Sequence, residues 1–266
     1  MNEARVAAGG GPELSVVIPF YDEEAAVGAL LDELYAVLAA LDRSWEIVAV
    51  DDGSSDATPE ILAAHARRRQ ELRVLRAPAN RGQAAALWAG LRAARAEVIV
   101  TLDGDGQNDP ADIPRLLDAL GDAAMVVGIR RDRRDSALRR VLSRLANAVR
   151  GRLLGDRLHD GGCALKVLRR EVIATLVPIR TLYSFLPALA TAAGFEVREL
   201  EVRHRPRRGG ASSYGLRVFL WRPLVDMLGV LWLRRRRFPP PDHAEVDPRP
   251  PASAPASPPA DRPRSR

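Results

Sequence analysis

The sequence predicts an α/β protein in which a mostly parallel central sheet is flanked by helices. Short apolar, β-branched runs alternate along the chain with longer segments of helical spacing, which is the order of right-handed β-α-β units. Aspartates and prolines stand where the helices should begin. Charged residues gather directly after the apolar runs, at the positions where such sheets bind their ligands.

The apolar runs and the segments between them define the expected elements. The predicted strands are residues 14–20, 45–51, 72–78, 97–103 and 123–130. The predicted helices are residues 23–41, 58–69, 82–96 and 110–120. Asp56 and Asp109 precede the second and fourth helices as N-caps, and Pro59 and Pro110 suit their first turns. A further alternating strand is expected just before residue 201.

The composition limits the classes of function. The chain has 266 residues, enough for one large α/β domain or two small ones, and 47% of them are hydrophobic. The formal charge is +6, yet Lys166 is the only lysine, which we interpret as a compositional habit of the source. This charge permits contact with nucleic acid, phosphates or anionic lipid. The single Cys163 fits a reducing compartment and is expected to be a small buried hydrophobe.

The chain is predicted to divide into four segments. Residues 1–12 form a flexible tail that lacks a secretory signal, and residues 13–215 form the folded domain. Residues 216–237 are apolar but interrupted by charges, which favours an amphipathic helix at a membrane interface over a bilayer span. A helix packed on the domain is the alternative for this segment. Residues 238–266 are Pro-rich and are expected to be disordered.

Two adjacent carboxylates, Asp51 and Asp52, end the second predicted strand. Carboxylates at this place can accept hydrogen bonds from a base edge or from ribose hydroxyls. A plain turn with a helix cap explains residues 53–56 but not two acids at the strand end. No G-x-G-x-x-G follows the first strand, so the common dinucleotide fingerprint is missing.

The fourth strand leads into Leu-Asp-Gly-Asp-Gly-Gln-Asn-Asp-Pro, residues 102–110. Asp103, Asp105 and Gln107 are spaced two apart, so an extended backbone would aim their oxygens the same way. Two carboxylates about 5 Å apart repel by roughly 3 kcal/mol at an effective dielectric near 20. Hard oxygen ligands suit Mg²⁺ or Mn²⁺ completed by phosphates and water. We therefore predict a cation that bridges to a nucleoside diphosphate, with a solvated acidic turn as the alternative.

Five motifs occur in the order VVIPFYDEE, DDGSSDAT, RGQAAALWAG, LDGDGQNDP and HRPRRGGASSYG. Together they resemble family 2 glycosyltransferases with the GT-A fold, specifically the polyprenyl-phosphate sugar transferases similar to dolichyl-phosphate mannosyl- and glucosyltransferases. The resemblance covers roughly residues 14–235. It implies an inverting hexosyltransferase that depends on Mg²⁺ or Mn²⁺.

The resemblance and the strand-end pattern together give roles to the acidic side of the site. The nucleotide-sugar would be held by Pro19, Tyr21, Glu23, Asp51, Asp52, Gln83 and Asp103. Asp105 and Gln107 would bind the metal, and the catalytic residues would be Asp103, Asp105 and Asp160. Gln83 belongs to a stretch of small residues that close helix–sheet packing explains equally well.

Arginines are expected on the acceptor side. By the resemblance, Arg130 meets the lipid phosphate or the donor diphosphate. Arg205, Arg207 and Ser212 can grip a phosphate through charge-assisted hydrogen bonds. The family pattern has Lys where this chain has Ser213, which removes one cation from the predicted phosphate site.

Asp160 lies in Leu-His-Asp-Gly-Gly-Cys-Ala-Leu-Lys, just before a further expected strand. It is either a general base or a residue that orients its loop. A base is needed only where the acceptor is a hydroxyl whose proton must leave. A phosphate monoester is already anionic near neutral pH, so positioning and charge neutralisation would carry catalysis.

The sequence thus predicts transfer of glucose, mannose or N-acetylglucosamine from a UDP- or GDP-linked donor to polyprenyl phosphate. The protein is expected in the cytoplasm, peripherally attached to the inner face of the cell membrane. One alternative is a transferase that acts on a sugar or protein hydroxyl, which an essential Asp160 would favour. The other is a non-catalytic nucleotide- or RNA-binding module. Since the acidic cluster would repel a polyanion, no nucleic acid partner is expected.

Overall fold

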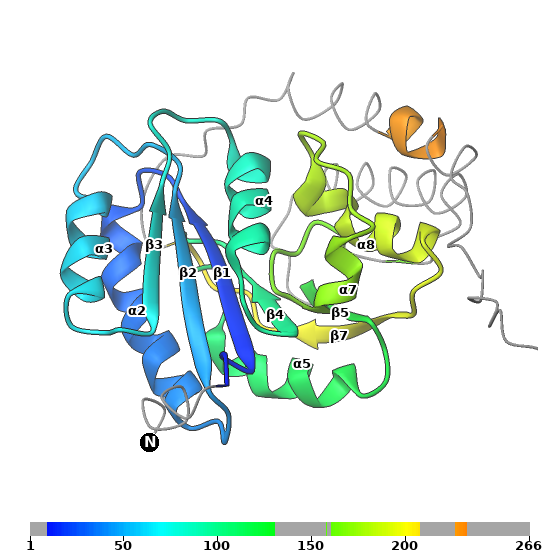
Figure 1. The fold of residues 1–266 in the computed structure, drawn as a ribbon, viewed down its shortest axis with the longest axis horizontal. Coiled ribbons are helices and arrows are strands. Elements are labelled where there is room, and N and C mark those ends of the chain that lie inside the picture. The colour runs from blue at the N-terminus through cyan, green and yellow to red at the C-terminus, as the bar shows by residue number, and fades with distance from the viewer. Residues whose placement is uncertain (1–9, 131–157, 159–160, 208–226, 233–266) are drawn as a thin grey trace, which may run out of the picture. The chain divides into compact units, whose positions relative to one another are not determined.

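The computed structural model describes residues 10–130, 158, 161–207 and 227–232. It contains one seven-stranded sheet with helices on both faces, as Figure 1 shows. The strands are β1 (Leu14–Phe20), β2 (Trp45–Asp51), β3 (Leu72–Arg76), β4 (Val98–Thr101), β5 (Met125–Arg130), β6 (Lys166–Arg169) and β7 (Val197–Val202). The helices are α2 (Glu24–Ala39), α3 (Thr58–Ala66), α4 (Gln83–Ala93), the 3₁₀ turn η1 (Pro110–Asp112), α5 (Ile113–Leu120), α7 (Arg170–Ile173) and α8 (Leu182–Ala192).

The predicted fold class, an α/β protein with a mostly parallel sheet, is confirmed. The five strands and four helices predicted between residues 14 and 130 are present, with ends shifted by up to a few residues, and the two further expected strands correspond to β6 and β7. Asp109 caps η1 by accepting a hydrogen bond from the Ala111 amide at 3.0 Å. Asp56 was expected as the N-cap of α3, but that position is Ala57. The Asp56 carboxylate still accepts from the Thr58 amide at 2.9 Å.

The strand order is β3-β2-β1-β4-β6-β5-β7, and β6 is the antiparallel member. It lies between β4 and β5 and runs against both of them. Lys166, its first residue, therefore pairs with Thr101 near the end of β4 and with Val127 in β5. The start of β6 thus lies at the edge where the parallel strands finish, which is where the predicted site lies.

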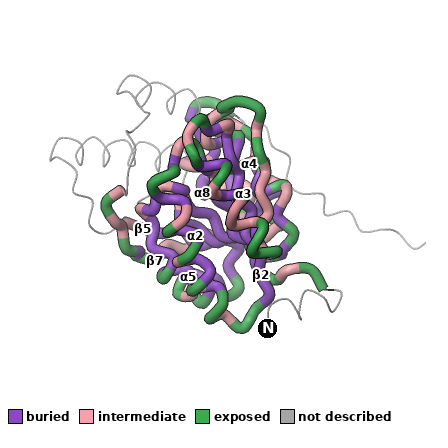
Figure 2. The backbone as a smooth tube through the Cα atoms, turned by 90° about the vertical axis from the view of Figure 1, so that its left-hand side faces the viewer, coloured by how far each residue is buried: buried purple, intermediate pink, exposed green. Residues whose placement is uncertain are grey.

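Two apolar cores form, one on each face of the sheet. Successive residues of a strand point to opposite faces, so Val16 and Ile18 of β1 pack with α2, α3 and α5, whereas Val17 packs with α4 and α8. Figure 2 shows the buried strands between helices whose outer sides are exposed. Cys163 is buried in the first core, as predicted. The sheet is therefore fixed from both sides, and its loops at the carboxyl edge are held on a rigid base.

Helix α4 lies very close to the sheet at Gly90. A Cβ atom there would stand 2.4 Å from Val17 Cγ1 and 3.1 Å from Val50 Cγ2. Both valines belong to central strands, so neither can move away. The small residues of the 82–96 stretch therefore serve helix–sheet packing at this point.

We expect Gly90→Ala to destabilise the protein by about 1–3 kcal/mol, the usual cost of overpacking a core. Gly28→Ala in α2 is the matched control, since a Cβ there meets its nearest atoms at 3.9 and 4.0 Å. That change should stabilise the fold by roughly 0.5–1 kcal/mol, because alanine favours a helix interior over glycine. Urea unfolding of both variants checks the pair, and equal stabilities would contradict this packing.

Candidate active site

The acidic loop after β4 lies directly on the end of β1. A Cβ atom on Gly104 would stand 2.8 Å from the Pro19 carbonyl oxygen and 2.4 Å from Phe20 Cδ1. Strands β1, β2 and β4 are parallel neighbours, so the segments that follow them meet at one edge. The carboxylates predicted from three separate strand ends are therefore brought to the same side of the sheet.

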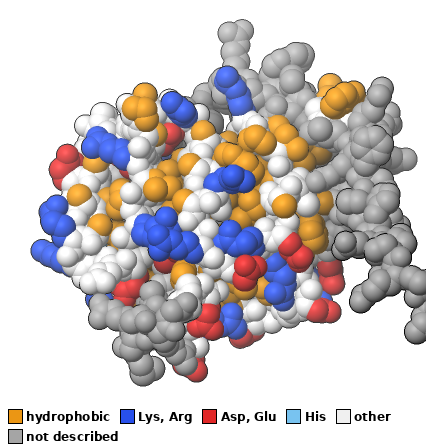
Figure 3. Space-filling model, viewed as in Figure 1, with side chains coloured by type: hydrophobic (Ala, Val, Ile, Leu, Met, Phe, Trp, Pro, Cys, Tyr) orange, Lys and Arg blue, Asp and Glu red, His pale blue; other side chains and the backbone are white. Residues whose placement is uncertain are grey.

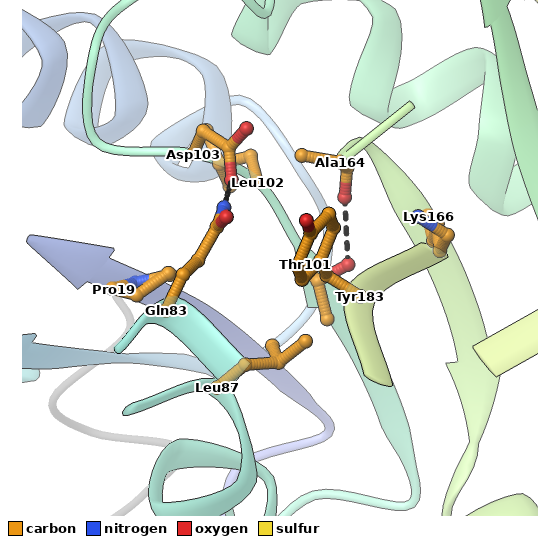
Figure 4. A pocket seen from close by; sticks show the side chains of 9 residues that line it. All are labelled: Pro19, Gln83, Leu87, Thr101, Leu102, Asp103, Ala164, Lys166 and Tyr183. Atoms are coloured by element: carbon orange, nitrogen blue, oxygen red, sulfur yellow. Dashed lines mark hydrogen bonds between the residues drawn. The ribbon is translucent and has the colours of Figure 1, made fainter. Parts of the chain in front are cut away.

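Asp103 is held by a side chain from α4. Gln83 Nε2 donates to Asp103 Oδ1 at 2.5 Å, as Figure 4 shows. Burial, and then the nearby Asp105 carboxylate, raise the pKa of Asp103 to about 6, while Lys166, Gln83 and Arg130 oppose the shift. Negative charge is thus concentrated on this loop and only partly compensated by the surrounding side chains.

Asp105 and Gln107 stand on the same loop, both half-buried. The backbone amide of Gln107 donates to Asp105 Oδ1 at 3.0 Å, which closes a tight turn. Asp103 and Asp105 offer only oxygen donors, a set that fits Mg²⁺ or Mn²⁺. Among the described residues, no group of three His, Cys, Asp or Glu side chains forms a complete metal site. The diphosphate and water that were predicted to complete the coordination of a cation stay a prediction.

The two acids at the end of β2 have protein partners. Asp51 is fully buried, accepts from the Ser54 amide at 2.9 Å and lies 3.1 Å from Arg76 Nε. Asp52 is also buried, and it accepts from the backbone amides of residues 81 and 82 at 2.9 and 2.7 Å. It thereby fixes the segment that leads into α4. Their predicted contacts with a nucleoside stay predictions.

The residues after β1 lie beside this cluster. Pro19 lines a small pocket together with Gln83 and Asp103, and Tyr21 is 39% exposed. Glu23 is buried, and its carboxylate accepts a hydrogen bond from the guanidinium of Arg207. Burial raises the pKa of Glu23, and the charge of Arg207 lowers it.

The arginine-rich segment after β7, where the acceptor side was predicted, packs against the acidic loop. The Arg205 amide donates to the Gln107 carbonyl at 2.9 Å, and His204 forms a β-bridge with Asn108. The Arg205 guanidinium contacts Glu33 at 2.6 Å and an Asp109 carboxylate oxygen at 2.7 Å. Arg205 is thus held by two carboxylates, a fact that its sequence position did not indicate.

The remaining predicted residues are placed in part. Arg130 ends β5 and is close enough to act on the charge of Asp103. Asp160 and Ser212, together with Ser213, lie outside the described residues. Most of the predicted helix at 216–237 and the whole tail at 238–266 also lie outside them.

Asp112 is an anchor that the sequence reasoning missed. It is fully buried at the start of α5, and it accepts from the Arg203 amide at 2.7 Å and contacts Arg115 Nη1 at 3.1 Å. An acidic residue in the first turn of a predicted helix is a common capping feature, and this obscured its contact with a segment 91 residues away.

We expect Asp112→Ala to lower stability by about 1–3 kcal/mol, because the part-buried backbone amide of Arg203 loses its acceptor. The segment 203–207 should also become more accessible to trypsin. Asp118→Ala, on the exposed side of the same helix, should change stability by no more than about 0.5 kcal/mol. Chemical unfolding with limited proteolysis distinguishes the two, and an Asp112 variant as stable as the control would refute the anchor.

The family of the chain follows from its sequence match. Residues 15–177 match the model of the glycosyl transferase family 2. The chain belongs to glycosyl transferase family 2. The resemblance drawn from five motifs is thereby confirmed, and the edge described above is the candidate active site of a family 2 glycosyltransferase.

Two curated relatives are similar to this glycosyltransferase over most of its length. A dodecaprenyl-phosphate galacturonate synthase of Rhizobium johnstonii is 37% identical over 230 residues, covering 84% of this chain and 68% of the relative. An undecaprenyl-phosphate 4-deoxy-4-formamido-L-arabinose transferase of Pseudomonas paraeruginosa is 42% identical over 204 residues, covering 76% of this chain and 60% of the relative. The chain thus spans 60 to 68% of the length of these relatives.

Solved structures share the fold. Glucosyl-3-phosphoglycerate synthase of Mycobacterium tuberculosis, in a complex with Mg²⁺ and UDP, matches with a TM-score of 0.63 at 22% identity, covering 88% of this chain and 83% of that chain. Its complex with Mn²⁺, UDP-glucose and phosphoglyceric acid matches with a TM-score of 0.60, at the same identity and coverage. The likeness confirms the GT-A fold that the motifs implied.

Proposed function

We propose that this glycosyltransferase moves a sugar from a nucleotide-sugar to a polyprenyl phosphate, with inversion at the anomeric carbon and with Mg²⁺ or Mn²⁺. The observation that carries the proposal is the meeting of two groups of side chains. The carboxylates of Asp103 and Asp105 lie on a loop whose Gln107 carbonyl accepts from the Arg205 amide. The proposed cation site and the proposed phosphate site would thus be adjacent, as transfer between two phosphate compounds needs.

The donor side of the proposal uses the acidic residues. Asp105, with Gln107, would hold the cation, which neutralises charge on the leaving diphosphate. Asp103 would lie beside the sugar diphosphate, oriented by Gln83. The nucleoside would be bound at the ends of β1 and β2, by Pro19, Tyr21, Glu23, Asp51 and Asp52.

The acceptor side uses the arginines. Arg207, Arg205 and Arg130, with Ser212, would bind the phosphate of the lipid through charge-assisted hydrogen bonds. A phosphate oxygen then forms a bond to the anomeric carbon while the bond from that carbon to the diphosphate oxygen breaks. No proton has to be removed, so the step needs no general base. Arg207 would exchange its contact with Glu23 for the incoming phosphate.

A membrane surface is the expected place of this reaction. Among the described residues, no helix combines the length and the apolar composition that a bilayer span requires. Residues 227–232 are helical, with Met227 and Val230 buried in the second core and Leu228 and Trp232 exposed to more than 60%. Figure 3 shows apolar side chains gathered over α4 and α8. These features support peripheral attachment through exposed apolar side chains.

The sugar remains the open part of the proposal. The three hexoses suggested by the motifs differ from the sugars in the names of the two relatives, which are galacturonate and 4-deoxy-4-formamido-L-arabinose. Both names include a polyprenyl phosphate, and this favours the lipid acceptor over a sugar or protein hydroxyl. We therefore propose a nucleotide-linked monosaccharide as the donor class, with UDP or GDP as the carrier.

The test is a transfer assay with radiolabelled donors and undecaprenyl phosphate in detergent. The panel contains UDP- and GDP-linked glucose, mannose and N-acetylglucosamine, together with the UDP-linked forms of the two sugars above. A butanol-extractable product from one donor, lost with EDTA, supports the proposal. Donor hydrolysis without lipid product refutes the lipid acceptor and directs the search to hydroxyl acceptors and to Asp160. Salt-sensitive RNA binding without donor turnover favours the non-catalytic alternative.

A further inference from the structure

Lys166 is a buried cation that the proposed mechanism does not use. It is the only lysine among 40 lysines and arginines in the chain. Its side chain is 2% exposed, and its ammonium donates to the Cys163 carbonyl. Burying an ammonium costs several kcal/mol unless nearby oxygens offset the loss of hydration. An apolar side chain would fill this position at lower cost, so packing alone does not explain the charge.

The position of Lys166 connects three parts of the site. It begins β6, between Thr101 of β4 and Val127 of β5, and it lines the same small pocket as Asp103 and Gln83 (Figure 4). Its positive charge acts on the Asp103 carboxylate. The ammonium therefore lies within electrostatic reach of the acidic loop while it is shielded from water.

The segment before β6 is held at two consecutive carbonyls. Lys166 binds the carbonyl of Cys163, and Thr101 Oγ1 donates to the carbonyl of Ala164 at 2.8 Å. Thr101 and Lys166 are paired residues of adjacent strands. These two bonds fix the 163–164 backbone next to the pocket, and one of the two donors, Thr101, stands two residues before Asp103 in the chain.

We propose that Lys166 is a positioning residue of the donor site, which partly balances the negative charge of the acidic loop and fixes the 163–164 backbone beside it. The inference rests on the proposed function. A compact ammonium suits this buried place between two strands better than the larger planar guanidinium that the chain uses elsewhere. With the charge present, the loop accepts an anionic diphosphate together with the cation. Without it, the loop becomes more negative and favours the cation over the nucleotide.

Lys166→Met, which keeps the length and removes the charge, tests this role by two changes of opposite sign. Binding of Mn²⁺ to the nucleotide-free protein, measured by electron paramagnetic resonance, should become about tenfold tighter, as expected for the removal of one nearby positive charge. The KM for the nucleotide-sugar should rise by a similar factor. A purely structural role would weaken both or change neither. Arg92→Met is the control, because it also removes one positive charge. Arg92 is exposed at the far end of α4, so this variant should leave the Mn²⁺ affinity unchanged.

The outcomes separate this inference from the proposed function. Equal Mn²⁺ affinity in the wild type and in Lys166→Met overturns the role of Lys166 while leaving the cation site intact. A wild-type protein that binds no Mn²⁺ overturns the proposed cation site and this role together. Lys166→Gln, which can still donate to the Cys163 carbonyl, carries the same test if the methionine variant does not fold.

Discussion

Asp105→Asn is expected to reduce sugar transfer by roughly 100- to 1,000-fold, the usual loss when one preorganised electrostatic group is removed from an active site. The substitution keeps the shape of the side chain and an oxygen that can accept from the backbone amide of Gln107, now at 3.0 Å. Only the charge is lost. The affinity for Mn²⁺ should fall with the rate, because the loop then presents one carboxylate fewer.

The fold should survive this change. Asp105 repels Asp103 and raises its pKa, so the neutral amide removes an unfavourable interaction. We expect a melting temperature equal to or above that of the wild type. Asp118→Asn, which removes an exposed charge on α5, is the control for both readouts. An Asp105 variant with full activity in EDTA-treated buffer would refute the cation role.

Gly104→Ala should have the second largest effect, on stability and activity together. Its Cβ would stand 2.4 Å from Phe20 Cδ1 and 2.8 Å from the Pro19 carbonyl oxygen. The Phe20 ring is 1% exposed within the first core, and the carbonyl belongs to β1, so the loop itself has to move. We expect a loss of about 1–3 kcal/mol of stability and, since a displacement near 1 Å misaligns reacting groups, roughly 100-fold slower transfer.

Gly90→Ala distinguishes the two consequences. It creates an equally close contact, 2.4 Å to Val17 Cγ1, but in the interior of α4 rather than in the acidic loop itself. Both variants should unfold at lower urea concentrations than the wild type. At a temperature where both are folded, transfer should be slow only in the Gly104 variant. Equal transfer rates in the two variants would show that the close contact between the acidic loop and β1 does not position the carboxylates.

Much of the fold follows from local signals in the sequence. The runs at 14–20 and 45–51 are β-branched and bounded by polar turns, and their ends agree with β1 and β2. Such signals act over a few residues and need no tertiary information. Strand β6 is different. A strand was expected after Asp160, but its antiparallel place between β4 and β5 is decided by long-range pairing.

The candidate site, too, has features that could be predicted from the sequence and features that depend on long-range contacts. The carboxyl-edge rule predicted that Asp103 and Asp105 would lie near the ends of β1 and β2, because it depends only on the parallel direction of the strands. It could not predict that Asp51 would be fully buried, or that Arg207 would pair with Glu23, 184 positions earlier in the chain. The sequence showed Lys166 as the only lysine. Its proposed role in the site could be inferred only from the sheet order, which places it beside β4.

The most direct measurement of the central claim is a crystal structure with Mn²⁺ and the nucleoside diphosphate that the donor panel selects, with the cation located by its anomalous scattering. The account predicts a cation about 2.1 Å from an Asp105 carboxylate oxygen, bridged to the diphosphate, with the nucleoside at the ends of β1 and β2. A cation or diphosphate bound elsewhere, with the acidic loop left in solvent, would contradict it.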